Sequence, residues 1–128
     1  MKLHSDSVFG KNRITAYGLD YVCINDQKAT RSLVVTPDTL QLHWPPNSWT
    51  ELRGEHLLSL LDLSPEILLL GSGQRQHIPS LGVLQILAQM PIGVEIMTTA
   101  AACRTYNILV AEGRTVAAAL ILTNSGSA

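Results

Sequence analysis

Residues 66–79 read EILLLGSGQRQHIP, and residues 93–109 read GVEIMTTAAACRTYNIL. In each stretch a short apolar run ends abruptly at small and polar residues. That pattern is typical of a buried parallel strand that leads into a loop at its carboxyl end. The residues between them, Pro79 to Met90, indicate a helix. Because neighbouring parallel strands end at one edge of a sheet, and open α/β sheets place their ligand crevice there, the pattern predicts where a site would lie.

The second half of the chain alternates between strands and helices. We expect strands over 66–70, 92–97 and 115–122, and helices over 79–90 and 99–112. These elements make two strand–helix–strand units, which should both be right-handed crossovers.

The first half is expected to be rich in strands. Its loosely alternating apolar residues and turn signals predict an antiparallel meander. The four strands are expected at Arg13–Gly18, Tyr21–Ile24, Lys28–Val35 and Thr39–Trp44. The Pro45–Pro46 loop ends this pattern. A short helix over Gly54–Leu61 should then face the core through Leu57, Leu58 and Leu61.

Length and composition favour a single globular domain. The chain has 128 residues, of which 46% are hydrophobic and 15% charged, so it can form a core without a metal ion or a disulfide. We expect an N-terminal segment over 1–12, a β-rich half over 13–53, an α/β half over 54–122 and a flexible tail over 123–128.

Charge and cysteine content exclude several classes of protein. The net charge of −1 provides no broad attraction for nucleic acid or an anionic membrane. No secretory signal is visible, and apolar runs such as Ile67–Leu70 and Val116–Leu122 are too short to cross a bilayer. The two cysteines share no short spacing, and His4, His43 and His56 lack metal-ligand spacing. We therefore expect a cytoplasmic protein without a nucleic-acid partner, membrane insertion, metal or cofactor.

The turn Gly71–Ser72–Gly73 follows a strand, as a phosphate-binding turn would. However, Gln76 stands where the Rossmann fingerprint needs its third glycine, and no Walker lysine follows. We favour the alternative that the two glycines allow a sharp turn out of a buried strand.

The start of the helix over 99–112 is a second candidate. Thr98 or Thr99 can cap it, and its free N–H groups, together with Arg75 and Arg104, would attract a small anion. We favour the competing interpretation, in which the alanines that follow let the helix lie tightly on the sheet.

Cys103, Glu95 and Asn107 each have a functional and a structural interpretation. The helix position and Arg104 would lower the pKa of the Cys103 thiol, but His77 is the only histidine in this half, so a small buried thiol is favoured. Glu95 lies mid-strand, so we expect it to be buried against an arginine or several N–H donors, with a general base as the alternative. Asn107 can share a face with Arg104 in the cleft, or satisfy nearby backbone groups.

At these residues the chain resembles a known family. The segments LLLGSGQRQHIP, GVEIMTTAAACRTYNIL and EGRTVAAALIL are similar to a small α/β domain of bacterial and archaeal proteins of unknown function. That domain also forms the mitochondrial NADH dehydrogenase (complex I) assembly factor 3. The resemblance implies an α/β fold of three layers, β/β/α, with a parallel central sheet and a second, antiparallel sheet. It implies no established catalytic residues.

Two functions are compatible with these features of the sequence. The scarcity of acid–base residues at the strand ends favours a non-catalytic binding or assembly factor for a protein partner, related to a respiratory complex only by analogy. The alternative is a cleft that binds, or acts on, a small anionic ligand. No residue is assigned as catalytic, and the oligomeric state stays open. The residues assigned to the cleft are Gly71, Gly73, Arg75, Glu95, Thr98, Cys103, Arg104 and Asn107.

Overall fold

The computed structural model describes residues 11–123 of the chain. Most of the expected N-terminal segment (1–12) and tail (123–128) therefore lies outside the described residues. The strands are β1 (Ile14–Tyr17), β2 (Val22–Ile24), β3 (Gln27–Ala29), β4 (Leu33–Val35), β5 (Leu40–Gln41), β6 (Ile67–Gly71), β7 (Gly93–Met97) and β8 (Val116–Leu120). The α-helices are α2 (Gly54–Leu58), α3 (Leu81–Gln89) and α4 (Thr99–Ala111), and short 3-10 turns cover Trp49–Glu51 and Ser59–Leu63.

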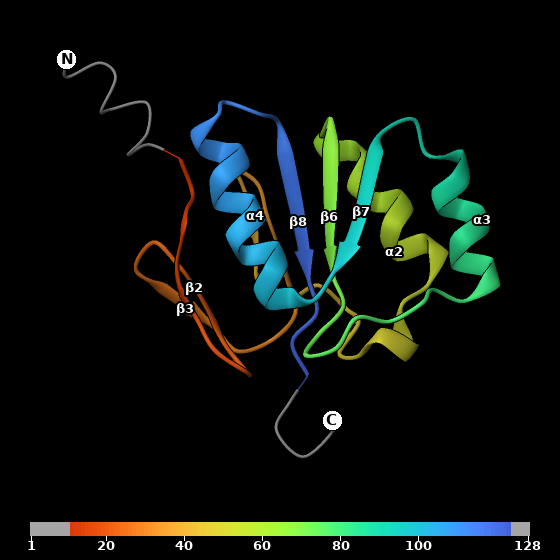
Figure 1. Cartoon of the computed structure of the whole chain (residues 1–128), viewed down its shortest axis with the longest axis horizontal. Coiled ribbons are helices and arrows are strands. Elements are labelled where there is room, and N and C mark those ends of the chain that lie inside the picture. Colours follow the sequence, from red (N-terminus) through yellow and green to blue (C-terminus); the bar gives the residue numbers. More distant parts are fainter. Residues whose placement is uncertain (1–10, 124–128) are drawn as a thin grey trace.

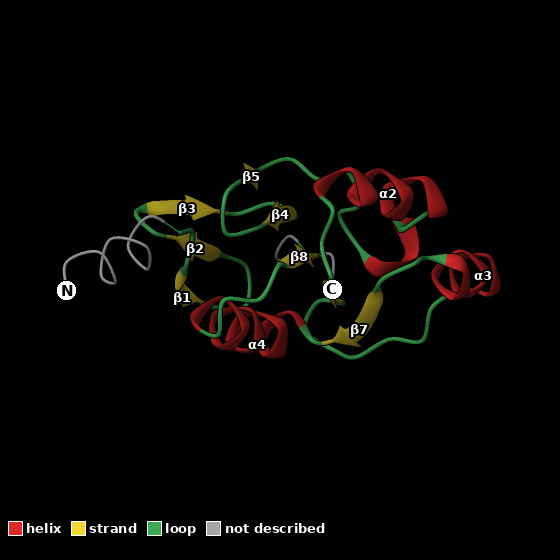
Figure 2. Ribbon diagram, turned by 90° about the horizontal axis from the view of Figure 1, so that it is seen from above, coloured by secondary structure: helices red, strands yellow, loops and turns green. Residues whose placement is uncertain are grey.

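Five strands form one sheet in the order β5-β4-β8-β6-β7. β6 pairs in parallel with β7 on one side and with β8 on the other, so that Leu69 lies opposite both Glu95 and Ala118. The connection through α3 joins neighbouring strands, whereas the connection through α4 passes over β6 (Figure 1). Because the two crossovers run in opposite directions along the sheet, their helices cover opposite faces. Figure 2 shows α2 and α3 on one side of this sheet, and α4 with β1–β3 on the other.

Burial on both faces explains why β6 is an interior strand of the sheet. Side chains alternate along a strand, and Leu69 joins the apolar cluster under α4, while Leu68 and Leu70 join the cluster under α2 and α3. Each of these leucines contributes about 1.5–3 kcal/mol when fully buried. Val116–Leu120 is buried throughout, and the alanines inside it allow close packing on both faces. The expected α/β fold with two sheets is confirmed. The sheet expected to be parallel is mixed, because β8, β6 and β7 are parallel whereas β4 pairs antiparallel with β8, and the second sheet is antiparallel as expected.

The single meander expected in the first half is wrong. β1, β2 and β3 form their own antiparallel sheet, whereas β4 pairs antiparallel with β8 and β5 continues that edge. The expected strand Lys28–Val35 is therefore two strands in two sheets. The chain changes sheet at Ser32, which is buried and whose Oγ accepts a hydrogen bond from the Leu122 N–H at 3.0 Å. The three consecutive buried residues of β4 belong to a sheet covered on both faces.

The strand expected over Thr39–Trp44 contains only the two residues of β5. Trp44 instead turns into the cluster under α2, where its ring meets His56 edge-on at a centroid distance of 6.2 Å. The helix expected over Gly54–Leu61 is divided between α2 and the following 3-10 turn. Leu57 is fully buried as expected, but Leu58 is 47% exposed, because the helix presents a narrower stripe to the core.

Gly71 allows the closest approach between β6 and α4. A Cβ at this position would lie 2.9 Å from Thr99 Oγ1 and 3.0 Å from Thr99 Cα. We expect Gly71→Ala to lower the free energy of unfolding by about 1–3 kcal/mol, because backbone must move to admit the methyl group. Urea denaturation measures this change.

The matched control is Gly82→Ala in α3, where an added Cβ meets nothing within 4 Å. This control should raise the free energy of unfolding by about 0.5–1 kcal/mol, because alanine loses less backbone entropy than glycine in a helix. Equal effects of the two substitutions would contradict the close approach at Gly71.

Candidate functional site

The carboxyl ends of β6 and β7 meet the start of α4, as the parallel arrangement predicts. The Ser72 N–H donates to the Met97 carbonyl at 2.8 Å, which holds the two strand ends together. The Thr99 N–H donates to the Gly73 carbonyl at 2.9 Å, and the Gly73 N–H donates back to Thr99 Oγ1 at 2.9 Å. The same hydroxyl donates to the Ile121 carbonyl at 2.8 Å. Thr99 therefore ties together three segments that are far apart in the sequence.

A small cavity of about 100 Å³ lies at this junction and is lined by Gly73, Thr98, Thr99 and Ala100, among others. Gly73 and the start of α4 therefore share one concavity at the edge of the sheet where β6 and β7 end. Gly73 adopts a φ of 102°, which only glycine reaches without strain.

The start of α4 offers few free donors to an anion. Thr98 caps the helix by accepting a hydrogen bond from the Ala101 N–H at 3.2 Å. The Thr99 N–H is taken by Gly73, and the Ala102 N–H donates to the Thr98 carbonyl at 2.9 Å. A helix leaves its first N–H groups unpaired, and here protein acceptors already satisfy two of them, those of Thr99 and Ala101. The structural interpretation of this helix start is the stronger one.

A larger cavity of about 500 Å³ opens beside the loop that follows β6. It is lined by Ser48, Trp49, Thr50, Ser72, Gln74, Arg75, His77 and Thr123. The Trp49 and His77 rings stack with centroids 5.9 Å apart and an interplanar angle of 17°, and Trp49 Nε1 donates to the Ile78 carbonyl at 3.2 Å. Of the expected cleft residues, only Arg75 lines this cavity. Sequence reasoning missed the ring stack, although an aromatic residue beside the Pro–Pro loop was a visible signal.

Cys103 does not belong to either cavity. It is fully buried in the cluster shared by α4 and the β1–β3 sheet. Burial raises the pKa of its thiol to about 12, and the nearby Arg104 charge opposes that rise only in part. The favoured interpretation of Cys103 as a small buried thiol is confirmed, because desolvation outweighs the lowering of its pKa by Arg104. His77 stacks on Trp49, so it does not serve as a base for this thiol.

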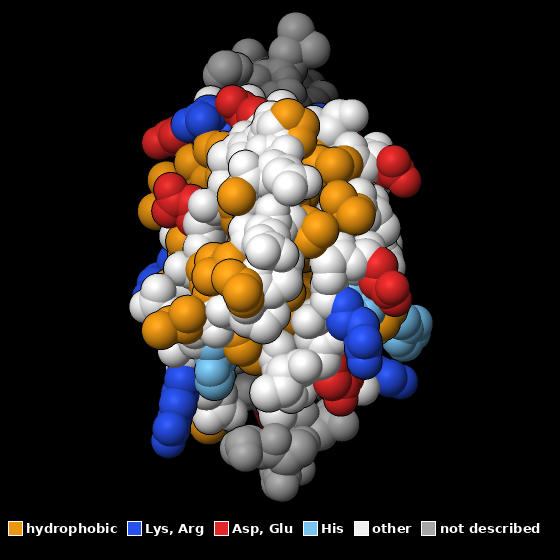
Figure 3. All heavy atoms as spheres, turned by 90° about the vertical axis from the view of Figure 1, so that its right-hand side faces the viewer, with side chains coloured by type: hydrophobic (Ala, Val, Ile, Leu, Met, Phe, Trp, Pro, Cys, Tyr) orange, Lys and Arg blue, Asp and Glu red, His pale blue; other side chains and the backbone are white. Residues whose placement is uncertain are grey.

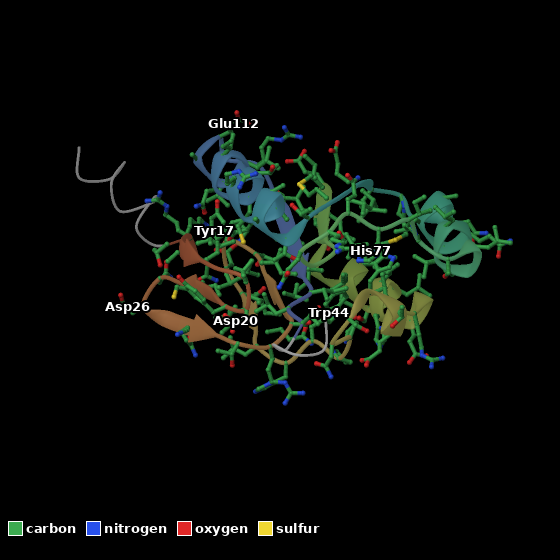
Figure 4. All side chains as sticks on the ribbon, turned by 60° about the horizontal axis from the view of Figure 1, so that its bottom comes forward. Tyr17, Asp20, Asp26, Trp44, His77 and Glu112 are labelled. Atoms are coloured by element: carbon green, nitrogen blue, oxygen red, sulfur yellow. The ribbon has the colours of Figure 1, made fainter. Side chains whose placement is uncertain are left out.

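Arg104 and Asn107 point away from the strand ends, toward β1. Arg104 Nη1 donates to the Tyr17 hydroxyl at 3.1 Å. The Asn107 side chain accepts from the Ile14 N–H at 2.9 Å and donates to the Ile14 carbonyl at 2.7 Å. Figure 4 shows Tyr17 on the β1–β3 side of the molecule and His77 on the α3 side. The side chains of Arg104 and Asn107 thus hold β1 against α4. The interpretation that Asn107 satisfies backbone groups is confirmed.

The expected burial of Glu95 is wrong. Its strand β7 lies at the edge of the sheet, where α4 does not cover it, and Glu95 is exposed. Within residues 11–123 the two ion pairs are Lys11–Asp38 and Glu66–Arg114, so Glu95 takes part in neither. The apolar pattern of β7 predicts a strand that is covered on both faces. It does not reveal that, within the described residues, β7 pairs with β6 alone.

Two further findings bear on function. In the described part of the chain, no three His, Cys, Asp or Glu side chains are grouped so that they could hold a metal ion. No helix between residues 11 and 123 is both long and apolar enough to cross a membrane.

Comparison with known proteins places this fold among relatives. The model of a family described as "Protein of unknown function (DUF498/DUF598)" matches residues 14–121. A curated relative from Xenopus tropicalis, named NADH dehydrogenase [ubiquinone] 1 alpha subcomplex assembly factor 3, is 36% identical over 84% of this chain and 60% of its own length. The chain therefore spans less than two thirds of that relative.

Solved structures with a similar fold are also known. A crystal structure of a Bordetella parapertussis protein matches with a TM-score of 0.81 and 38% identity, over 88% of this chain and 97% of that one. A Bordetella pertussis protein described as a Mth938-like domain matches with a TM-score of 0.76 and 30% identity, over 92% of this chain and 88% of that one.

The buried position of Cys103 predicts that its thiol is modified slowly by thiol reagents at neutral pH. In a Cys23→Ser variant, Cys103 should react with a thiol reagent only as fast as the protein unfolds, because burial disfavours the thiolate. The half-buried Cys23, left alone in a Cys103→Ser variant, is the matched control and should react faster in the native state. Rapid native-state modification of Cys103 would contradict a structural role.

Proposed function

The chain belongs to the DUF498/DUF598 family, and from this membership together with its surface we propose that it is a non-catalytic binding or assembly factor for a protein partner. The observation that carries the proposal is an exposed apolar surface on and beside α3. Ile78, Leu81 and Leu84 are 86%, 71% and 42% exposed. We call these three residues the α3 surface.

The charge distribution around the α3 surface favours a protein as the partner. Residues 76–94 contain no Lys, Arg, Asp or Glu. Figure 3 views the molecule from the α3 side, where apolar and uncharged groups occupy the middle and charged side chains lie around the margin. An apolar centre depleted of charge inside a polar rim is the usual anatomy of a protein–protein interface. Exposed apolar patches on a folded protein often mark such sites.

The relatives suggest which partner to seek first. Those named as assembly factors of NADH dehydrogenase act, by that name, on a protein complex. For this chain we propose a subunit of a multi-subunit complex, with a respiratory NADH dehydrogenase as the first class to examine. Cys103, Arg104 and Asn107 have structural roles, so these three members of the proposed cleft do not support a catalytic function.

A capture experiment in the native host tests the proposal. The tagged chain should retain a partner that a Leu81→Glu/Leu84→Glu variant loses by about tenfold or more, because two charges would be buried in an apolar contact. Ile108→Glu on α4 is the matched control, since Ile108 is 58% exposed on another helix. Both variants should keep the circular dichroism spectrum of the parent chain.

Quantitative mass spectrometry of the captured proteins distinguishes the outcomes. Capture that is equal for the α3 variant and the control would contradict binding at the α3 surface. Capture of a protein unrelated to respiration, lost only in the α3 variant, would keep the binding function and remove the respiratory analogy.

The cavity beside Arg75 favours a second candidate function, the binding of a small anion. Arg75 and His77 line it, and no carboxylate does. Titration of the isotope-labelled chain with inorganic phosphate should shift the amides of residues 72–77, and Arg75→Ala should weaken binding about tenfold, as expected for a lost charged hydrogen bond. Arg104→Ala, which removes an exposed arginine bonded to Tyr17, should leave phosphate binding unchanged. Shifts that are insensitive to Arg75→Ala would contradict this second function.

A further inference from the structure

β7 is an edge strand with part of its backbone unpaired. It pairs with β6 on one side, and no strand within residues 11–123 pairs with its other side. The Gly93 N–H donates to the Glu66 carbonyl, and the Met97 carbonyl accepts from the Ser72 N–H. In a parallel ladder, alternate residues of a strand bond to the same neighbour. The backbone groups that bond to β6 are therefore those of Gly93, Glu95 and Met97. The N–H and C=O groups that point away from β6 belong to Val94 and Ile96.

Few features of the outer edge of β7 would prevent another strand from pairing with it. The Gln76 side chain donates to the Ile96 carbonyl at 3.3 Å, which occupies one of the outward groups. Natural sheets usually shield an edge with charges, proline or a bulge. Here Val94 and Ile96 are half-buried apolar residues in the cluster under α2 and α3. Helix α3 lies next to β7 (Figure 1). Glu95 is the single charge of the strand, and it is exposed on the face opposite Val94 and Ile96.

We propose that the free edge of β7 accepts an extended segment of a different protein, in which a lysine or arginine stands between two apolar residues. This inference rests on the proposed binding function and names the kind of partner. In the added strand, the basic side chain lies beside Glu95. The two apolar side chains point to the other face, where they continue the apolar surface of Val94 and Ile96 toward α3. Backbone hydrogen bonds provide affinity, and the alternating side chains provide specificity.

The charge of Glu95 decides against a second copy of this chain as the occupant. In the antiparallel register that overlaps two β7 strands fully, Val94 faces Ile96 and Glu95 lies directly opposite the same residue of the other copy. Like charges directly opposite each other destabilise strand pairing, whereas opposite charges stabilise it. A segment that carries a basic residue at this position is therefore the complementary occupant.

Nuclear magnetic resonance with two synthetic peptides tests the proposal. The first is a capped peptide of the order Ser, Thr, Val, Lys, Val, Thr, Ser, and the second carries Glu in place of Lys. At millimolar concentration the lysine peptide should shift the Val94 and Ile96 amides and slow their hydrogen exchange. The glutamate peptide should bind about fivefold more weakly, as expected from a change of about 1 kcal/mol in a cross-strand pair.

Two variants of β7 separate strand addition from other binding. Val94→Pro removes an N–H that faces away from β6, so the β6 ladder should survive while peptide binding is lost. Glu95→Lys should reverse the preference between the two peptides, and it keeps the test decisive if the proline variant fails to fold.

Several outcomes would overturn the proposal. The absence of shifts at Val94 and Ile96, or an unchanged preference in Glu95→Lys, would do so directly. Shifts confined to α3 and equal in Val94→Pro would overturn strand addition but leave the proposed function intact. A dimer of the chain alone that Val94→Pro dissociates, observed by sedimentation, would show that the occupant is a second copy.

Discussion

Burial of β6 on both faces is the constraint on which the rest of the structure depends. Its leucines alternate between two apolar clusters, and each cluster needs its own cover of helices. Because β6 also pairs on both edges, the strands before and after α4 must lie on opposite sides of it. This arrangement places α3 and α4 on opposite faces. It also leaves β7 at the edge of the sheet, beside a helix whose outer side is apolar.

The same constraint explains why polar groups at the ends of the parallel strands bond to other groups of the protein. The Thr99 hydroxyl and backbone satisfy Gly73 and Ile121, and Gly71 lets the two segments approach closely. Two of the donors that would otherwise attract an anion at the start of α4, the Thr99 and Ala101 N–H groups, are already bonded within the protein. The protein itself thus fills part of the ligand crevice expected for an open α/β sheet. The larger cavity lies instead beside Arg75 and the Trp49–His77 stack.

Much of the second half could be predicted from the sequence, because abrupt ends of apolar runs and helical spacing are local signals. The strands β6, β7 and β8 and the helices α3 and α4 were all expected within two residues of their observed ends. The division of the first half between two sheets could not be predicted, since it depends on β4 pairing with β8, which is distant in the chain. The environments of Glu95 and Arg104 could not be predicted for the same reason: strand order and the position of β1 determine them, and no local pattern encodes either.

We propose that the side of the molecule formed by α3 and the edge of β7 contacts a protein partner. Site-specific photo-crosslinking in the native host tests this most directly, with the photoreactive residue placed at Leu81 or, for comparison, at Ile108 on α4. We expect a discrete crosslinked partner from position 81 and none from position 108. A discrete partner from position 108 alone, or crosslinks from neither position, would contradict this proposal.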